Sequence, residues 1–236
     1  MSTDGSDGKA LVNRYAATSA WRSVDQYFAS ALVDEDEALI AARESGPRTT
    51  MPNAEVAANQ GKWLGLIAQI SGARRVLEFG TLAGYSTIWF ARAVGDGGKV
   101  VTFELKAQNA QLAVENLDRA GVRDRVEVVV GPAAESASRL ISTSAEPFDL
   151  VFIDADKPSN PQYLAAALEL TKSGAVIIID NVVRDGAVVD ADSTDPRAIG
   201  VRRVVDDIAA NPLLDATAIQ TVGEKGWDGF IIARRR

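Results

Sequence analysis

Hydrophobic residues recur at two different spacings along the chain, and the change of spacing separates a helical N-terminal part from an alternating core. Over residues 21–40, apolar side chains return every third or fourth position, which predicts one or two amphipathic helices. A turn-like stretch at 45–52 precedes a second helical pattern over 54–71, and Gly72 is a typical residue to end it. The part before residue 72 is therefore predicted to be mainly helical.

From residue 75 onward, short β-branched runs alternate with helical patterns. Continuous apolar runs such as 175–179 suit strands that are covered on both faces, as in a parallel sheet between two layers of helices. The two last strands are expected to be antiparallel, at the edge of the sheet. The predicted fold is α/β, with a doubly wound, mostly parallel seven-stranded sheet. The predicted strands are 75–79, 99–103, 125–130, 148–153, 175–179, 216–222 and 229–233, and the predicted helices of this part are 85–94, 107–120, 136–141, 161–171 and 197–210.

One domain over residues 1–236 is expected, because the chain has no internal repeat and no linker long enough to separate two domains. Residues 1–10 are mainly Gly, Ser and Asp, and we expect them to be disordered because they have little to bury. Residues 11–71 then form the N-terminal helices, and residues 72–236 form the α/β core.

Composition and charge restrict the partners of this domain. With 47% hydrophobic residues, the chain can bury a substantial core. A formal net charge of −7 argues against a nucleic-acid-binding protein, because phosphate recognition normally needs a basic face. No apolar run reaches the roughly 18 to 20 residues that cross a bilayer, and the polar N-terminus lacks the features of a signal peptide. We therefore expect a cytoplasmic protein that binds neither nucleic acid nor membrane.

Two residue types that often carry out chemistry are absent. The sequence contains no Cys, which excludes disulfides, thiolate nucleophiles and cysteine zinc sites. It also contains no His, which excludes imidazole bases and imidazole ligands. Any metal must therefore bind to oxygen atoms, and any general base must be Asp, Glu, Lys or Tyr.

A glycine-rich turn follows the first predicted strand, in the run E-F-G-T-L-A-G-Y-S at residues 78–86. Gly80 and Gly84 permit a tight turn and close approach to a ligand at the carboxyl edge of the sheet, where open α/β sheets bind small molecules. The G-x-x-x-G spacing differs from that of dinucleotide-binding turns, and no phosphate-loop ending follows. Glu78 would repel a phosphate but favours a cationic ligand, and S-adenosylmethionine (SAM) carries both a sulfonium and an ammonium.

A second acidic residue, Glu104, ends the next predicted strand, where a carboxylate commonly binds both hydroxyls of a ribose. The alternative is structural: Gly80 and Gly84 only shape the turn between strand and helix, and Glu104 is a solvated strand end. The two acidic positions together favour a cofactor site.

These features resemble the class I methyltransferase fold. The E-x-G-x-x-x-G-Y-S motif, Glu104 and the run Gly131-Pro-Ala133 are similar, more specifically, to metal-dependent O-methyltransferases such as the catechol and caffeoyl-coenzyme A enzymes, over residues 51–236. The resemblance implies a Rossmann-like fold with an N-terminal lid, SAM as cofactor, and a homodimer. It places Gly80, Tyr85 and Ser86 at the methionine end, Glu104 at the ribose and Ala133 at the adenine. The cofactor contacts predicted in this way are Met51, Glu78, Gly80, Gly84, Tyr85, Ser86, Glu104, Ala133 and Asp154.

Acidic and amide side chains end two further predicted strands. Asp154 follows the fourth strand, and Asp180 with Asn181 follows the fifth, so all three should meet at the edge that holds the glycine turn. Such oxygen ligands suit a hard divalent cation, with Mg²⁺ expected and Mn²⁺ or Ca²⁺ as competitors. The alternative is that each residue caps a helix or faces water. The resemblance favours the metal site.

Lys157 follows Asp154 by three positions, and the resemblance makes this D-x-x-K run a metal and base position. We predict that Asp154 and Lys157 are catalytic, with Lys157 as the general base; the alternative is a surface lysine in a loop. The expected reaction transfers the methyl group of SAM to a hydroxyl of a small catechol-like acceptor, with a divalent cation bound to two adjacent acceptor oxygens.

Other functions stay open. The chain fits a SAM-dependent methyltransferase of another acceptor class, or a cofactor-binding protein without activity. A nicotinamide-dependent oxidoreductase is disfavoured by the glycine spacing.

The sequence departs from the resembled families near the acceptor. Asp156 stands where the mammalian catechol enzymes carry Trp, and residues 182–184 lack a Trp that the plant caffeoyl enzymes place nearby. The acceptor is therefore specified only as a vicinal diol on an aromatic ring. Asp228-Gly229 is predicted to form the turn of the last hairpin, and the less favoured alternative is that Asp228 contacts the substrate. Met51 is explained equally well as a cofactor contact or as the entry to a helix.

Overall fold

The structure is a computed structural model, and it describes residues 18–236. The predicted disorder of residues 1–10 lies outside the described residues. Within residues 18–236, no helix is long and apolar enough to cross a membrane. The helices of this part are α1 (Thr18–Leu32), α2 (Glu37–Glu44), α3 (Ala58–Ile70), α4 (Tyr85–Val94), α5 (Ala107–Arg119), α6 (Ala133–Ser142), α7 (Asn160–Leu170) and α8 (Pro196–Ala210). The strands are β1 (Arg75–Phe79), β2 (Lys99–Glu104), β3 (Val126–Val130), β4 (Phe148–Ile153), β5 (Thr171–Asp180), β6 (Leu214–Gly223) and β7 (Gly226–Arg235).

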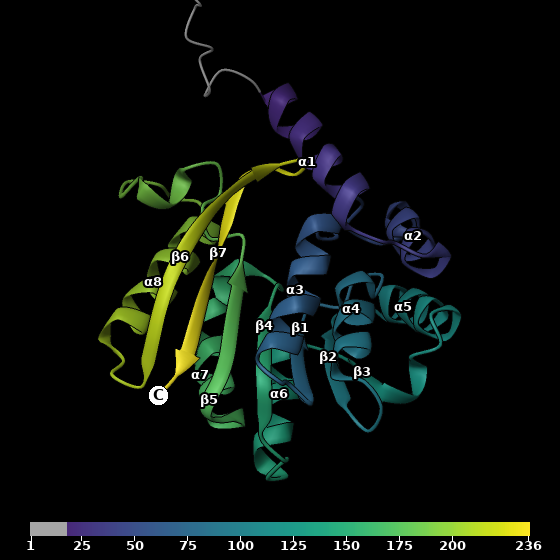
Figure 1. Cartoon of the computed structure of the whole chain (residues 1–236). Helices are drawn as coiled ribbons and strands as arrows, with labels where there is room; N and C mark the ends of the chain where they lie inside the picture. Colours follow the sequence, from purple (N-terminus) through teal and green to yellow (C-terminus); the bar gives the residue numbers. More distant parts are fainter. Residues whose placement is uncertain (1–17) are drawn as a thin grey trace, which may run out of the picture.

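The seven strands form one twisted sheet in the order β3-β2-β1-β4-β5-β7-β6 (Figure 1). Strands β1 to β5 are parallel, whereas β7 pairs antiparallel with both β5 and β6. The predicted doubly wound, mostly parallel fold with an antiparallel edge is therefore confirmed. Because the strand order reverses between β1 and β4, their carboxyl ends border the crevice where this class of sheet binds ligands.

Helices cover both faces of the sheet. Because alternate residues of a strand point to opposite faces, neighbouring residues of one strand belong to different cores. Val76 of β1 belongs to a core with residues of α2, α3, α4 and α5, whereas its neighbour Leu77 belongs to a core with residues of α6, α7 and α8. Both residues are fully buried. The continuous apolar runs of the central strands are explained by this burial on two sides.

Helices α1 and α2 lie near the carboxyl edge of the sheet, whereas α3 covers one of its faces (Figure 1). The helical pattern over 21–40 resolves into two helices, and Asp36 starts the second by accepting the backbone N–H of Leu39 at 3.0 Å. Helix α1 projects past the tip of the β6–β7 hairpin, while α3 packs against α4 (Figure 1). The N-terminal part and the hairpin thus approach each other above the carboxyl ends of the strands.

The last hairpin differs from its prediction. Asp228 lies inside β7, opposite Thr221, and the turn is made by residues 224–225 between Gly223 and Gly226. The prediction of a turn at Asp228-Gly229 was wrong because a second glycine pair lies nearby. Gly226 adopts the left-handed φ of +94° that a tight turn requires, so the chain reverses there.

Candidate functional site

A cavity of about 1190 Å³ opens at the carboxyl ends of β1, β2, β4 and β5. The N-terminal segment before α3 and the β6–β7 hairpin form its remaining walls. Most of the predicted site residues share this cavity, whereas Glu78 and Gly84 are not among the residues that line it. The predicted residues that line it are Met51, Gly80, Tyr85, Ser86, Glu104, Ala133, Asp154, Lys157, Asp180 and Asn181.

The glycine turn brings β1 and β4 close together at the floor of the cavity. Gly80 has a φ of +101°, and a Cβ atom there would lie 2.6 Å from the backbone oxygen of Asp154. A side chain at position 80 would therefore clash with backbone, in a conformation that L-residues avoid. Gly84 also has a positive φ, and it is the residue that starts α4. Its role in the structure is to shape the turn.

Glu78 lies beneath the cavity and is fully buried. Its carboxylate accepts hydrogen bonds from three hydroxyls: Ser86 Oγ at 2.6 Å, Thr87 Oγ1 at 2.5 Å and Thr102 Oγ1 at 2.7 Å. Burial raises the pKa of Glu78 to about 7, although the three hydroxyls act in the opposite direction. Glu78 thus fixes the side chain of Ser86, which lines the cavity.

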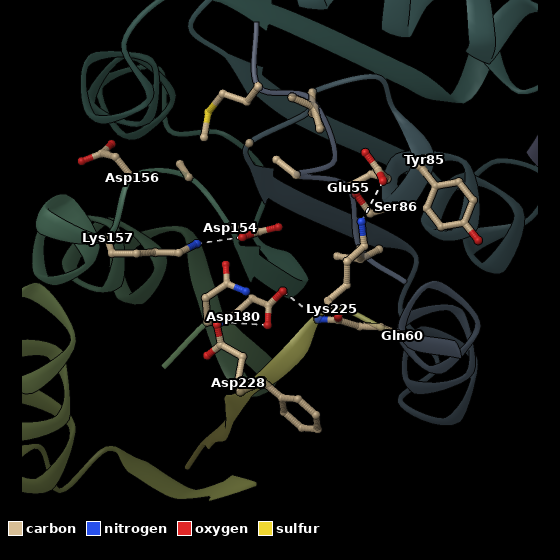
Figure 2. Close-up of a pocket in the computed structure, with 18 of the residues that line it drawn as sticks. Glu55, Gln60, Tyr85, Ser86, Asp154, Asp156, Lys157, Asp180, Lys225 and Asp228 are labelled. Carbon is tan, nitrogen blue, oxygen red and sulfur yellow. Dashed lines mark hydrogen bonds and ion pairs between the residues drawn. The ribbon is translucent and has the colours of Figure 1, made fainter. Parts of the chain in front are cut away.

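Tyr85 contributes to the cavity wall, but its hydroxyl is engaged elsewhere. The hydroxyl donates to Glu35 Oε1 at 2.8 Å, and Glu35 also forms an ion pair with Arg43 at 3.0 Å. Desolvation raises the pKa of Tyr85 above its ordinary value, which keeps the hydroxyl protonated. In Figure 2 this hydroxyl points away from Asp154 and Asp180. Tyr85 therefore joins α4 to the segment between α1 and α2.

Glu104 ends β2 with an oriented carboxylate. It accepts the backbone N–H groups of Leu82 and Lys106, both at 2.9 Å, and the side-chain amide of Asn109 at 3.1 Å. Asn109 in turn bonds with Thr50, so this carboxylate is connected to the N-terminal segment. Sequence patterns did not identify Asn109 or Thr50, because neither belongs to a motif and they are 59 positions apart.

The acidic residues predicted at the ends of β4 and β5 converge (Figure 2). Lys157 Nζ forms an ion pair with Asp154 Oδ1 at 2.7 Å, and Lys157 is only 8% exposed. Asp180 is 3% exposed; its Oδ2 accepts the side-chain N–H of Gln60 at 2.7 Å, and its Oδ1 accepts the backbone N–H of Asn181. Gln60 thereby links α3 to the floor of the cavity.

The charges at this floor fit a divalent cation. Desolvation and the neighbouring charge of Asp154 raise the pKa of Asp180, and the ammonium of Lys157 opposes this effect only in part. The ammonium of Lys157, paired with Asp154, therefore does not fully offset the negative charge of the two carboxylates. In the described part of the chain no group of three or more acidic side chains gathers as a metal cage, so the donor set here is two carboxylates and the carboxamide of Asn181. These are hard oxygen donors.

Asp228, which was expected in a turn, instead lines the cavity and holds the loop after β5. Its Oδ1 accepts the backbone N–H groups of Val183 at 3.0 Å, Arg184 at 3.1 Å and Gly229 at 3.0 Å. Arg184 has a positive φ of 57°, an uncommon conformation for a residue with a side chain. The hydrogen bonds that Asp228 accepts stabilise this loop against its backbone strain.

Aromatic and charged side chains also line the cavity. Trp63 of α3 and Phe230 of β7 stack with ring centroids 4.2 Å apart. At the hairpin tip, Lys225 Nζ donates to Glu55 Oε1 at 2.8 Å and to the backbone oxygen of Asn53 at 3.0 Å. Asp156 accepts hydrogen bonds from the hydroxyls of Tyr163 and Ser159. The cavity thus has an aromatic pair next to Asp180, and Lys225 joins the hairpin tip to the N-terminal segment.

Comparison with known proteins agrees with this architecture. The model of the O-methyltransferase family matches residues 29–236. The chain is 51% identical over 210 residues to the catechol O-methyltransferase of Mycobacterium tuberculosis, covering 89% of this chain and 94% of that protein.

Two solved structures are similar in fold as well as in sequence. An O-methyltransferase from Bacillus cereus, in complex with SAH, has a TM-score of 0.91 and 48% identity, and covers 93% of this chain and 100% of its own. An O-methyltransferase from Streptomyces achromogenes involved in tomaymycin synthesis, in complex with SAM, has a TM-score of 0.89 and 46% identity. The match covers 92% of this chain and 97% of that chain. With the cavity, the glycine turn and these relatives in agreement, the chain belongs to the O-methyltransferase family and is a SAM-dependent enzyme of that family.

Proposed function

We propose that the protein transfers the methyl group of SAM to one hydroxyl of a catechol-like acceptor, an aromatic ring with two adjacent hydroxyls, with the help of a divalent cation. The observation that carries the proposal is the convergence of Asp154, Lys157 and Asp180 in the cavity that also holds the glycine turn and Glu104. The 51% identity to a relative named catechol O-methyltransferase supports the acceptor class.

The cofactor lies, in this proposal, along the carboxyl ends of β1, β2 and β3. Glu104 accepts the ribose hydroxyls, and its three N–H donors already orient the carboxylate for that task. Gly80 and Ser86 contact the methionine part, and Ala133 lies beside the adenine. Glu78 acts through Ser86, since Glu78 is fully buried and does not line the cavity. Further contacts proposed from the sequence are Met51, Tyr85 and Asp154, which all line the cavity.

Asp154, Asp180 and Asn181 would hold the cation, with Mg²⁺ expected and Mn²⁺ or Ca²⁺ as alternatives. A divalent cation bound there would lower the pKa of an acceptor hydroxyl. Gln60 orients Asp180 through the hydrogen bond to its Oδ2. Asp154 orients Lys157, because their ion pair keeps the amine at the floor of the cavity.

The ammonium of Lys157 first releases a proton to solvent, and the neutral amine then accepts the proton of the acceptor hydroxyl at its Nζ. The acceptor oxygen then forms a bond to the methyl carbon of SAM, and the carbon–sulfur bond breaks with its electron pair left on sulfur. The products are the methyl ether of the acceptor and S-adenosylhomocysteine. The Trp63–Phe230 pair provides an aromatic surface in the cavity, beside Asp180, which suits an aromatic ring.

We also propose a homodimer, as the resemblance implies. Apolar side chains of α1 support it, because Tyr27 is 67% exposed and Leu32 is 68% exposed. An apolar helix surface of this kind is a common site of association between subunits. Sedimentation of the purified protein tests this proposal, and a monomer at micromolar concentration would contradict it.

The experiment that tests the proposed chemistry compares turnover of a catechol with Mg²⁺ and with a chelator, in the wild type and in Asp154→Ala. We expect the variant to lose the turnover that depends on Mg²⁺ while its affinity for S-adenosylhomocysteine changes by less than about threefold. Asp118→Ala, at an exposed position of α5, is the control and should behave as the wild type. Metal-dependent turnover that persists in Asp154→Ala contradicts the assignment.

A further inference from the structure

Asn109 lies in the first turn of α5, and its side chain is almost completely buried, at 2% exposure. Its Oδ1 accepts the backbone N–H of Thr50 at 3.0 Å. Its Nδ2 donates to Thr50 Oγ1 at 3.0 Å and to Glu104 Oε1 at 3.1 Å. One carboxamide therefore joins the carboxylate proposed for the ribose to the N-terminal segment that passes over the cavity.

The partners determine the orientation of this carboxamide. A backbone N–H can only donate, so the oxygen of Asn109 must face Thr50. An ionised carboxylate can only accept, so the nitrogen of Asn109 must face Glu104. A carboxylate at position 109 would lose both donated bonds and lie beside Glu104 as a like charge, and an aliphatic side chain would lose all three bonds. The arrangement specifically needs a carboxamide.

The same segment is joined to α5 by two further hydrogen bonds and by an ion pair between Arg48 and Glu115 at 3.6 Å. Asn116 Nδ2 donates to Ser45 Oγ at 2.9 Å, and Gln108 Nε2 donates to the backbone oxygen of Arg48 at 2.9 Å. The chain then reaches Thr50, which is held by Asn109, and continues to Met51 in the cavity wall. Among these contacts, Asn109 is the one that also bonds to a residue proposed to bind the cofactor.

We propose that Asn109 is a positioning residue for the cofactor site: anchored by Thr50, it orients Glu104 toward the ribose hydroxyls. The inference rests on the proposed role of Glu104. Asn109 lines the cavity and bonds to Thr50 and Glu104, and no hydrogen bond joins it to Asp154, Lys157 or Asp180, so we expect its effect on cofactor affinity and not on the transfer step. Because it acts through Glu104, that effect depends on the hydroxyls of the ribose.

The test measures calorimetric affinity for two ligands, S-adenosylhomocysteine and its analogue lacking both ribose hydroxyls. Asn109→Leu removes all three hydrogen bonds at similar volume, and Thr50→Val removes only the hydroxyl that accepts from Nδ2. Gln108→Ala is the matched control, because it removes a bond to the same segment from the neighbouring residue of α5. Glu104→Gln tests the ribose assignment itself, and thermal melting of each variant establishes folding.

We expect Asn109→Leu to bind S-adenosylhomocysteine about tenfold more weakly and Thr50→Val about threefold more weakly, with the analogue bound within twofold of the wild type by both. Gln108→Ala should match the wild type for both ligands. If Asn109→Leu does not fold, Thr50→Val carries the same prediction.

Equal affinity of the wild type and Asn109→Leu (or Thr50→Val) for S-adenosylhomocysteine overturns the inference. So does an equal loss of affinity for both ligands, since that is the sign of a general structural role. If Glu104→Gln binds S-adenosylhomocysteine as tightly as the wild type, the ribose assignment fails and the inference fails with it. If Glu104→Gln weakens binding and Asn109→Leu does not, only the inference fails.

Discussion

Replacing Glu78 with Gln should change how the stability of the fold depends on pH. Glu78 is fully buried, and burial raises its pKa from 4.5 to about 7. In the unfolded chain the group loses its proton near pH 4.5, whereas in the fold it keeps the proton to about pH 7. The folded state therefore binds more protons in that interval, and stability falls as pH rises through it.

The magnitude follows from the two pKa values. One pKa unit corresponds to about 1.36 kcal/mol, so full ionisation of Glu78 costs the fold about 3 kcal/mol. Between pH 5 and pH 8 the cost increases by about 2 to 3 kcal/mol, because a small part is already present at pH 5. The hydrogen bonds from three hydroxyls lower the pKa of Glu78, and the value of about 7 is the result of burial and of these bonds together.

Urea unfolding of the cofactor-free protein, in chelator, measures this effect. The free energy of unfolding of Glu78→Gln minus that of the wild type should rise by about 2 to 3 kcal/mol from pH 5 to pH 8. Subtraction removes the titration of groups that the two proteins share. Glu127→Gln, at an exposed position of β3, is the control and should show no such slope. A difference for Glu78→Gln that stays constant within about 0.5 kcal/mol would refute the reasoning.

Two further predictions concern the cofactor and the base. Glu104→Ala should weaken affinity for SAM about 10- to 100-fold in calorimetry, because it removes charge-assisted hydrogen bonds to the ribose; unchanged affinity contradicts the ribose assignment. Lys157→Met should lower kcat about 10²- to 10⁴-fold with little change in the KM of the acceptor, because the variant lacks the proposed proton acceptor. Lys172→Met, at an exposed position of β5, is its control, and a kcat of Lys157→Met within tenfold of the wild type would exclude the role of base.

The central strands were predictable because burial on both faces leaves a strong sequence signal. The predicted ranges of β1 and β4 agree with the structure at both ends, and the observed β5 is longer because it begins at Thr171, directly after α7. The hairpin turn was misplaced because Asp228-Gly229 is locally as good a turn as the actual one between Gly223 and Gly226. Local chemistry does not distinguish the two, whereas the pairing of whole strands does.

The candidate site was predictable where residues share a strand end. The carboxyl edge of a parallel sheet brings Asp154 and Asp180 together whatever the intervening helices are. Contacts between distant segments have no such signal: Gln60 bonds to Asp180 across 120 positions. The sequence also did not indicate that Glu78 lies beneath the cavity, because the three hydroxyls that hold it come from α4 and β2. Such contacts arise only when the helices pack onto the sheet.

We propose that the enzyme methylates, in this cavity, one of the two adjacent hydroxyls of its aromatic acceptor with the help of a divalent cation. The most direct measurement is the transfer of labelled methyl from SAM to catechol and to its isomer hydroquinone, each with Mg²⁺ and with a chelator. We expect a labelled monomethyl ether of catechol with Mg²⁺, and little product with the chelator or from hydroquinone. Equal methylation of both isomers, or methylation of catechol that the chelator does not reduce, would contradict it.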